Sequence, residues 1–210
     1  KIGSLREKES KEFVRRLIKR WKELRVSFRG PVLHAADWQF FPTRPTNFPT
    51  LRLAAASVLL QKFLCEDFFR KAIQSIKLSN DMVMLRQRLQ DMLAAKPLPF
   101  WSHHYGFDEA SQKAIKPLGP ERINDMIMNA IVPVALLYAR TFKDKTVREQ
   151  TLRLYETFPP LMENSLTKLM KKQLVKGRFK LDAVGLQQGA IQLYKFYCVE
   201  ERCAECEVGK

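Results

Sequence analysis

Three cysteines near the carboxyl end are the residues best suited to hold a metal ion. Cys198, Cys203 and Cys206 fall within the last thirteen residues of the sequence. Two thiolates separated by two residues, as in Cys203 and Cys206, can reach one metal from a single turn. The cysteine-rich segment 198–209 therefore predicts zinc or an iron–sulfur cluster as a cofactor. The candidates for a fourth ligand are Cys65, His34, His103 and His104.

Packing and ordinary thiol chemistry give a second interpretation of these cysteines and histidines. In this interpretation the cysteines are reduced structural thiols, or Cys203 and Cys206 form a disulfide. Adjacent histidines such as His103 and His104 can bind metal or transfer protons. We favour metal binding for the cysteines. For the two histidines we favour packing against Trp101, because adjacent side chains point in different directions and no carboxylate pair completes a site.

Basic residues form the second group that indicates a function. The sequence holds 37 Lys plus Arg against 22 Asp plus Glu, a net charge of +15. Residues 1–30 contain eleven basic and four acidic residues, and residues 167–180 contain five Lys, one Arg and no acid. Such residues bind phosphates without base-specific geometry. A solvated helix face is the alternative, and for the charge alone we favour it, because no stacking strand or groove-reading motif accompanies the charge. The predicted nucleic-acid-binding residues are Lys11, Arg15, Lys19, Lys22, Lys171 and Lys172.

Two arginines stand on either side of the proline-rich segment 45–49. Arg44 and Arg52 can clamp an anion there, or they can fix the loop by bonding its carbonyl groups. We favour the loop-fixing role, because an irregular segment in a helical core needs internal donors. The sequence has no Gly-rich phosphate loop, serine nucleophile elbow or His-Glu-x-x-His motif. No catalytic residue is therefore predicted.

Apolar side chains recur at steps of three and four along most of the chain, which predicts amphipathic helices. Helices are therefore the elements that position these residues. Pro133, inside the longest of these helices, predicts a kink. Either Ser79 or Asn80 is predicted to cap the helix that follows them. The predicted helices are 5–28, one that starts near Pro49, 67–76, 81–95, 121–142, 147–158, 161–175 and 184–200.

The sequence lacks the signals of β-strands. No window alternates at period two, and 8 glycines are few for a hairpin-rich fold. We predict an all-α fold, a compact irregular multi-helix bundle with a cysteine-containing C-terminal tail, as a single domain over residues 1–210. The first residue is Lys rather than Met, which indicates a C-terminal fragment of a longer protein. No apolar run reaches the roughly 18 residues of a membrane span and the first residues are charged, so we expect a cytoplasmic protein with no membrane partner.

Three blocks of sequence together resemble a known family. They are residues 44–53, residues 122–138 with Asn129 and Pro133, and residues 187–194 with the terminal cysteines. The chain resembles the C-terminal half of a bacterial family catalogued as domain of unknown function 2851, over most of its length. The resemblance implies that the blocks belong to one recurrent domain and that the three terminal cysteines match those of the family. The family name gives no function.

Charge and cysteines together support one hypothesis and two alternatives. The hypothesis is a non-catalytic helical module of a larger cytosolic protein, stapled by a metal, whose basic surface contacts nucleic acid. The first alternative is the helical portion of an enzyme, nuclease-like by analogy, whose catalytic residues lie in the absent N-terminal half. The second alternative is a protein-interaction bundle whose charge serves solubility. The expected partners are nucleic acid and the missing N-terminal half.

Overall fold

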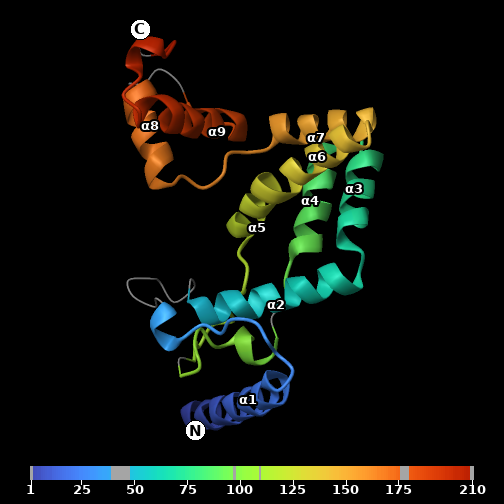
Figure 1. Cartoon of the computed structure of the whole chain (residues 1–210), viewed down its shortest axis with the longest axis vertical. Helices are drawn as coiled ribbons and strands as arrows, with labels where there is room; N and C mark the ends of the chain where they lie inside the picture. The colour runs from blue at the N-terminus through green and yellow to red at the C-terminus, as the bar shows by residue number, and fades with distance from the viewer. Residues whose placement is uncertain (1, 39–47, 97, 109, 176–179, 209–210) are drawn as a thin grey trace. The chain divides into compact units, whose positions relative to one another are not determined.

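The computed structural model describes residues 2–38, 48–96, 98–108, 110–175 and 180–208. Their regular secondary structure is helical (Figure 1), and the β-type pairing found among them is an isolated bridge between His104 and Ala110. The all-α prediction is therefore confirmed. Of the helices in this part of the chain, none is both long enough and apolar enough to span a lipid bilayer.

The chain divides into two compact units. The first is formed by Lys1–Phe68 and Ala94–Gly119, and the second by Phe69–Leu93 and Pro120–Lys210. Each unit is described by itself below. The single domain expected over residues 1–210 stays a prediction.

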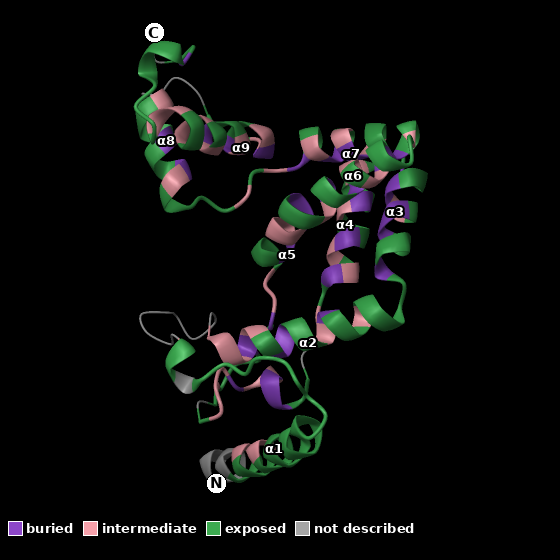
Figure 2. Ribbon diagram, viewed as in Figure 1, coloured by how far each residue is buried: buried purple, intermediate pink, exposed green. Residues whose placement is uncertain are grey.

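The first unit is built around α2 and a short 3-10 helix. It contains α1 (Ile2–Arg25), α2 (Pro49–Cys65) and the 3-10 helix Phe100–Ser102. Helix α2 begins with Pro49 because the fixed backbone angle of proline suits a first helical turn, where its missing N–H is not needed. Figure 2 shows buried positions on α2 and on the 3-10 helix. The core of this unit consists of Leu51, Ala54, Phe100, Trp101 and Ile115.

The second unit contains the remaining helices. Helix α7 contacts α6, α4 and α9, and α8 packs on α9. Buried aliphatic side chains from these helices supply the core, among them Ile76, Leu85, Leu89, Ile127, Val147 and Leu154. The helices are α3 (Phe68–Leu78), α4 (Met82–Leu93), α5 (Pro120–Met126), α6 (Val132–Thr141), α7 (Lys145–Thr157), α8 (Ser165–Val175) and α9 (Val184–Leu193).

The kink predicted at Pro133 takes the form of a π-helical segment. Residues Ile127–Ile131 separate α5 from α6, and the Val132 N–H donates to the carbonyl oxygen of Ile127. Pro133 has no N–H and its ring crowds the carbonyl four residues earlier, so the regular ladder is interrupted here. The Asn129 side chain donates to the Asp125 carbonyl oxygen at 2.9 Å. The side-chain amide of Asn129 is thus bonded within the helix itself.

The cap of α4 differs from the prediction. The Asp81 carboxylate accepts from the N–H groups of Val83 at 2.7 Å and Met84 at 3.1 Å. The Ser79 hydroxyl instead donates to the Asp81 carbonyl oxygen at 2.9 Å. The prediction of Ser79 or Asn80 as the cap was wrong because the helix starts at Met82, which places Asp81 at the capping position.

Candidate functional site

Helix α1 is attached to the first unit through an aromatic stack. The ring of Phe13 lies parallel to that of Phe100, with centroids 3.9 Å apart, and meets Trp101 edge-on at 5.8 Å. His104 also stacks on Phe100, with ring centroids 3.9 Å apart. Its Nδ1 lies 2.8 Å from the Phe100 carbonyl oxygen. The buried His104 therefore has a packing role, as predicted, although it stacks on Phe100 rather than on Trp101.

A row of cations runs along the side of α1 that faces away from this stack. Successive residues of an α-helix are rotated by about 100° around the helix axis. Around the axis of α1, five basic side chains fall within an arc of about 80°, and the centre of that arc lies about 160° from Phe13. No other residue between Lys8 and Lys22 falls within that arc. The five side chains are exposed, as Figure 2 shows for most of α1. We call this row the basic stripe, and its members are Lys8, Lys11, Arg15, Lys19 and Lys22.

The acidic residues of α1 whose side chains the structure describes lie outside the basic stripe. Glu9, Glu12 and Glu23 fall on a flank that they share with Arg16 and Arg20. Arg20 pairs with Glu23 at 2.8 Å on that flank. Between Lys8 and Glu23 the charge of α1 is thus sorted into a mixed flank and a purely basic stripe. The stripe contains four of the six predicted nucleic-acid-binding residues.

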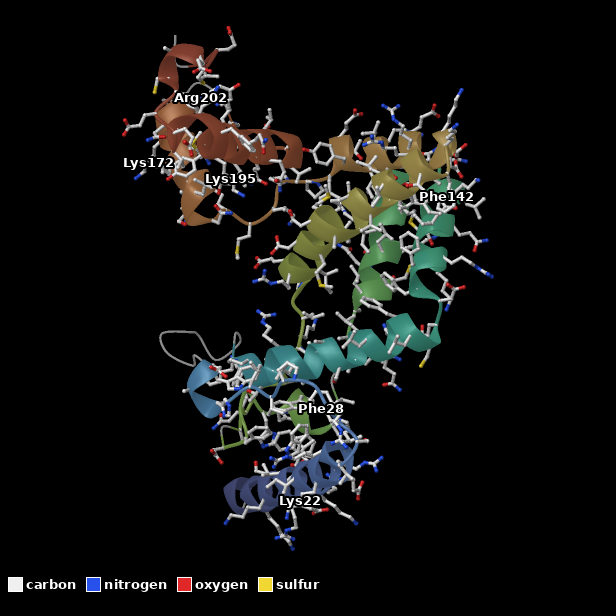
Figure 3. The ribbon with its side chains drawn as sticks, in the orientation of Figure 1. Lys22, Phe28, Phe142, Lys172, Lys195 and Arg202 are labelled. Carbon is white, nitrogen blue, oxygen red and sulfur yellow. The ribbon has the colours of Figure 1, made fainter. Side chains whose placement is uncertain are left out.

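The other two predicted residues, Lys171 and Lys172, lie on α8. Lys171 pairs with Glu163 at 2.8 Å, and this hydrogen bond and charge lower the pKa of the Glu163 carboxyl below its ordinary value. Lys172 is exposed in the last turn of α8. Two further exposed cations that the sequence reasoning missed, Lys195 and Arg202, follow α9 in the chain and are labelled in Figure 3. Arg202 is itself paired with Glu205. Acidic partners therefore offset part of this second group of cations.

The three terminal cysteines occupy different environments. Cys198 ends the π-helical segment Tyr194–Cys198 and is half-buried, Cys203 is exposed, and Cys206 is buried. All three are free thiols, so the Cys203–Cys206 disulfide is not formed here. Among the residues that the structure describes, no group of three or more His, Cys, Asp or Glu side chains is placed to hold a metal ion. The zinc or iron–sulfur site on these cysteines stays a prediction.

The remaining predicted residues are not gathered into a metal site in the part of the chain that the structure describes. Arg44 lies outside the described residues. Arg52 lies in the first turn of α2, where its backbone N–H donates to the Phe48 carbonyl oxygen at 3.1 Å, and its anion-binding or loop-fixing role stays a prediction. Of the proposed fourth ligands, Cys65 and His34 are exposed and His103 is half-buried.

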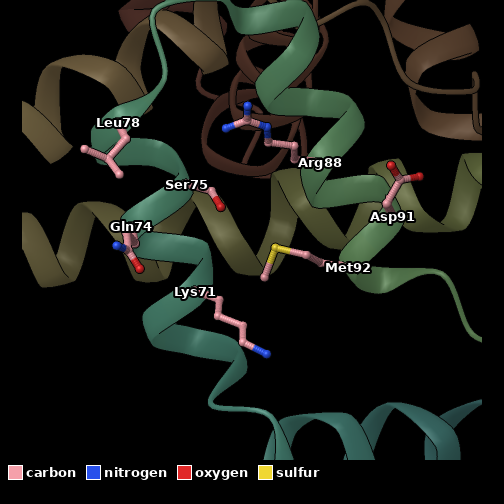
Figure 4. Close-up of a pocket in the computed structure, with 7 residues that line it drawn as sticks. All are labelled: Lys71, Gln74, Ser75, Leu78, Arg88, Asp91 and Met92. Atoms are coloured by element: carbon pink, nitrogen blue, oxygen red, sulfur yellow. The ribbon is translucent and has the colours of Figure 1, made fainter.

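A hollow of about 410 Å³ lies between α3 and α4 in the second unit (Figure 4). The cations Lys71 and Arg88 line it together with the carboxylate of Asp91, which offsets one of the two positive charges. Asp91 also accepts from Gln87 at 2.9 Å. It is a shallow, open groove, and we assign it no chemistry.

Fold and site together define an all-helical protein that carries a basic helix. The chain belongs to the family described as Protein of unknown function (DUF2851), whose model matches residues 1–164. The matched range includes the basic stripe and Arg52 and ends before the terminal cysteines, so the match of those cysteines to the family stays a prediction. Searches among curated proteins and among solved structures gave no significant match.

Proposed function

We propose that this chain is a helical module that binds nucleic acid through the basic stripe of α1. The observation that carries the proposal is the sorting of charge on that helix. Five exposed cations share one arc, and Glu9, Glu12 and Glu23 lie outside it. Cations arranged in this way attract phosphates and release the counterions that surround them.

The length and position of the stripe support this function. From Lys8 to Lys22 the helix rises about 21 Å, at about 1.5 Å per residue. A row of that length can meet several successive phosphates of one strand. Because the Phe13 stack lies on the opposite side of α1, the stripe can be covered by a ligand without displacing the contact that holds the helix.

A charge-removal variant tests the proposal. The stripe variant carries Lys11→Gln, Arg15→Gln, Lys19→Gln and Lys22→Gln, and binding is measured by fluorescence anisotropy with a labelled oligonucleotide over a range of salt concentrations. Each lost phosphate contact should lower the slope of log affinity against log salt by about 0.7 for a single strand. Four lost contacts reduce the magnitude of the slope by about 2.8. Between 50 and 200 mM salt, the affinity of the wild type should therefore fall about 50-fold more than that of the stripe variant.

A matched control separates the stripe from net charge. The control variant removes four exposed cations of the second unit, through Lys143→Gln, Lys145→Gln, Arg148→Gln and Arg153→Gln. It has the same net charge as the stripe variant. We expect the control to keep the wild-type slope. An equal loss in both variants would show that overall charge, and not the stripe, attracts the nucleic acid.

A further inference from the structure

Two aromatic side chains lie exposed at the C-terminal end of α1. Trp21 is 40% exposed and Phe28 is 47% exposed. Their ring centroids are 6.2 Å apart and the rings are tilted by 56°. We call this pair the aromatic platform. Large aromatic side chains are mostly buried in monomeric domains, so an exposed pair marks a surface that can receive a ligand.

The end of α1 is folded in a way that holds the platform. The N–H groups of Ser27 and Phe28 both donate to the Leu24 carbonyl oxygen at 3.1 Å, which turns the chain as the helix ends. The Phe28 ring then lies close against Gly30, where an added Cβ would be 2.5 Å from the ring. Glycine at this position therefore leaves the room that the ring occupies beside Trp21.

Cations flank the platform and connect it to the basic stripe. At about 100° per residue, Arg25 lies between Trp21 and the stripe residue Lys22 on the surface of α1. Arg29 follows Phe28 in the chain, and its guanidinium donates to the Val26 carbonyl oxygen at 3.3 Å. Figure 3 shows Lys22 on the helix and Phe28 just beyond its end. A bound polyanion on the stripe would thus reach the two rings.

We propose that the aromatic platform stacks the bases of single-stranded nucleic acid whose phosphates lie on the basic stripe. This inference rests on the function proposed above and names the form of nucleic acid. Base pairs in a duplex hide the faces of the bases, whereas an unpaired base offers its face to an aromatic ring. The combination of a cationic track with exposed rings is the arrangement that binds single strands without sequence preference. A second copy of the chain would bring like charges together.

The test compares two labelled probes with equal charge. One is a twelve-nucleotide oligothymidine, and the other is an abasic strand with the same number of phosphates. The wild-type chain should bind the oligothymidine about fivefold to a hundredfold more tightly, the range expected when one base stacks on an aromatic side chain. The variants Trp21→Leu and Phe28→Leu should lose most of this preference and keep their affinity for the abasic strand.

Gly30→Ala provides a variant that leaves both rings in the sequence. The added methyl group displaces the Phe28 ring, which is the end of a flexible side chain, so the fold is kept. We expect the preference for oligothymidine to fall in this variant too. Phe142→Leu is the control, because Phe142 is a 67% exposed aromatic residue of the second unit. It should leave the preference unchanged.

The remaining outcomes show whether the inference alone fails or the proposed function fails with it. Equal binding of both probes by the wild type, with a salt slope that the stripe variant reduces, overturns the platform and leaves the proposed function standing. Binding of neither probe overturns both. Equal binding of the probes together with Trp21-dependent binding to phosphatidylserine vesicles would identify an anionic lipid surface, the other ligand suited to a basic amphipathic helix, and would also overturn the inference.

Discussion

Replacing Phe13 by alanine should loosen the attachment of α1 to the first unit. Phe13 is the residue of α1 whose ring packs on Phe100 and Trp101. Apolar residues further along the helix, such as Leu17 and Leu24, are 43% and 61% exposed and add little to this contact. Alanine favours helix at least as well as phenylalanine, so the substitution removes the contact without weakening the helix.

The size of the effect follows from the burial and ring geometry of Phe13. Full burial of a phenylalanine contributes about 1.5 to 3 kcal/mol, and a half-buried side chain contributes about 1 to 2 kcal/mol. Its pairs with Phe100 and Trp101 add about 1 kcal/mol more. The loss of about 2 to 3 kcal/mol would raise the population of detached α1 between about thirtyfold and about 150-fold.

Hydrogen exchange of the α1 amides measures this detachment directly. The amides of α1 should exchange faster in Phe13→Ala, while those of α4 and α7 in the second unit keep their wild-type rates. Leu24→Ala is the matched control, because it removes an exposed apolar side chain from the same helix, and it should leave α1 protected. Wild-type exchange of α1 in Phe13→Ala would refute the role of the aromatic stack.

Two further predictions concern the second unit. The hydrogen bond and charge of Lys77, at 2.7 Å, lower the pKa of Asp144, whose carboxylate also caps α7 through the Val147 N–H. This stabilisation is present above the ordinary carboxyl pKa of about 3.9 and is lost as the pH falls through the lower native value. The urea midpoint of Asp144→Asn should therefore lie below that of the wild type at pH 7 and approach it in acid, and a difference that persists in acid would contradict this. The exposed Cys203 should react with a thiol reagent faster than the buried Cys206, and added zinc should slow both reactions if the metal prediction holds, so unchanged rates would argue against it.

Local chemistry explains why much of the fold could be predicted from the sequence. Apolar side chains at steps of three and four reflect a helix that buries one face, and this signal is contained within each segment. The kink at Pro133 is equally local, since proline lacks the N–H that the ladder needs. The cap of α4 was missed because Ser79, Asn80 and Asp81 are all good caps, and the exact start of the helix decides between them.

Tertiary packing explains what the sequence could not predict about the candidate site. Four stripe residues were predicted because charge sorts around α1 by helical period. The ion pair of Lys171 with Glu163 depends on how the chain enters α8. The aromatic platform was missed because an amphipathic pattern predicts that Trp21 is buried, whereas the structure leaves it 40% exposed. No spacing rule states which apolar residues of a helix find a partner.

Helix α1 has three faces, one packed on the first unit and two exposed. Phe13 faces the core of the first unit, the basic stripe faces away from it, and the platform residue Trp21 lies between them. Because these roles fall on separate arcs, loss of the stack should free the helix without removing its charge. Loss of the stripe should likewise remove binding without releasing the helix. If either substitution produced both effects, the faces would not act separately, and the assignment of nucleic-acid binding to the stripe alone would have to be abandoned.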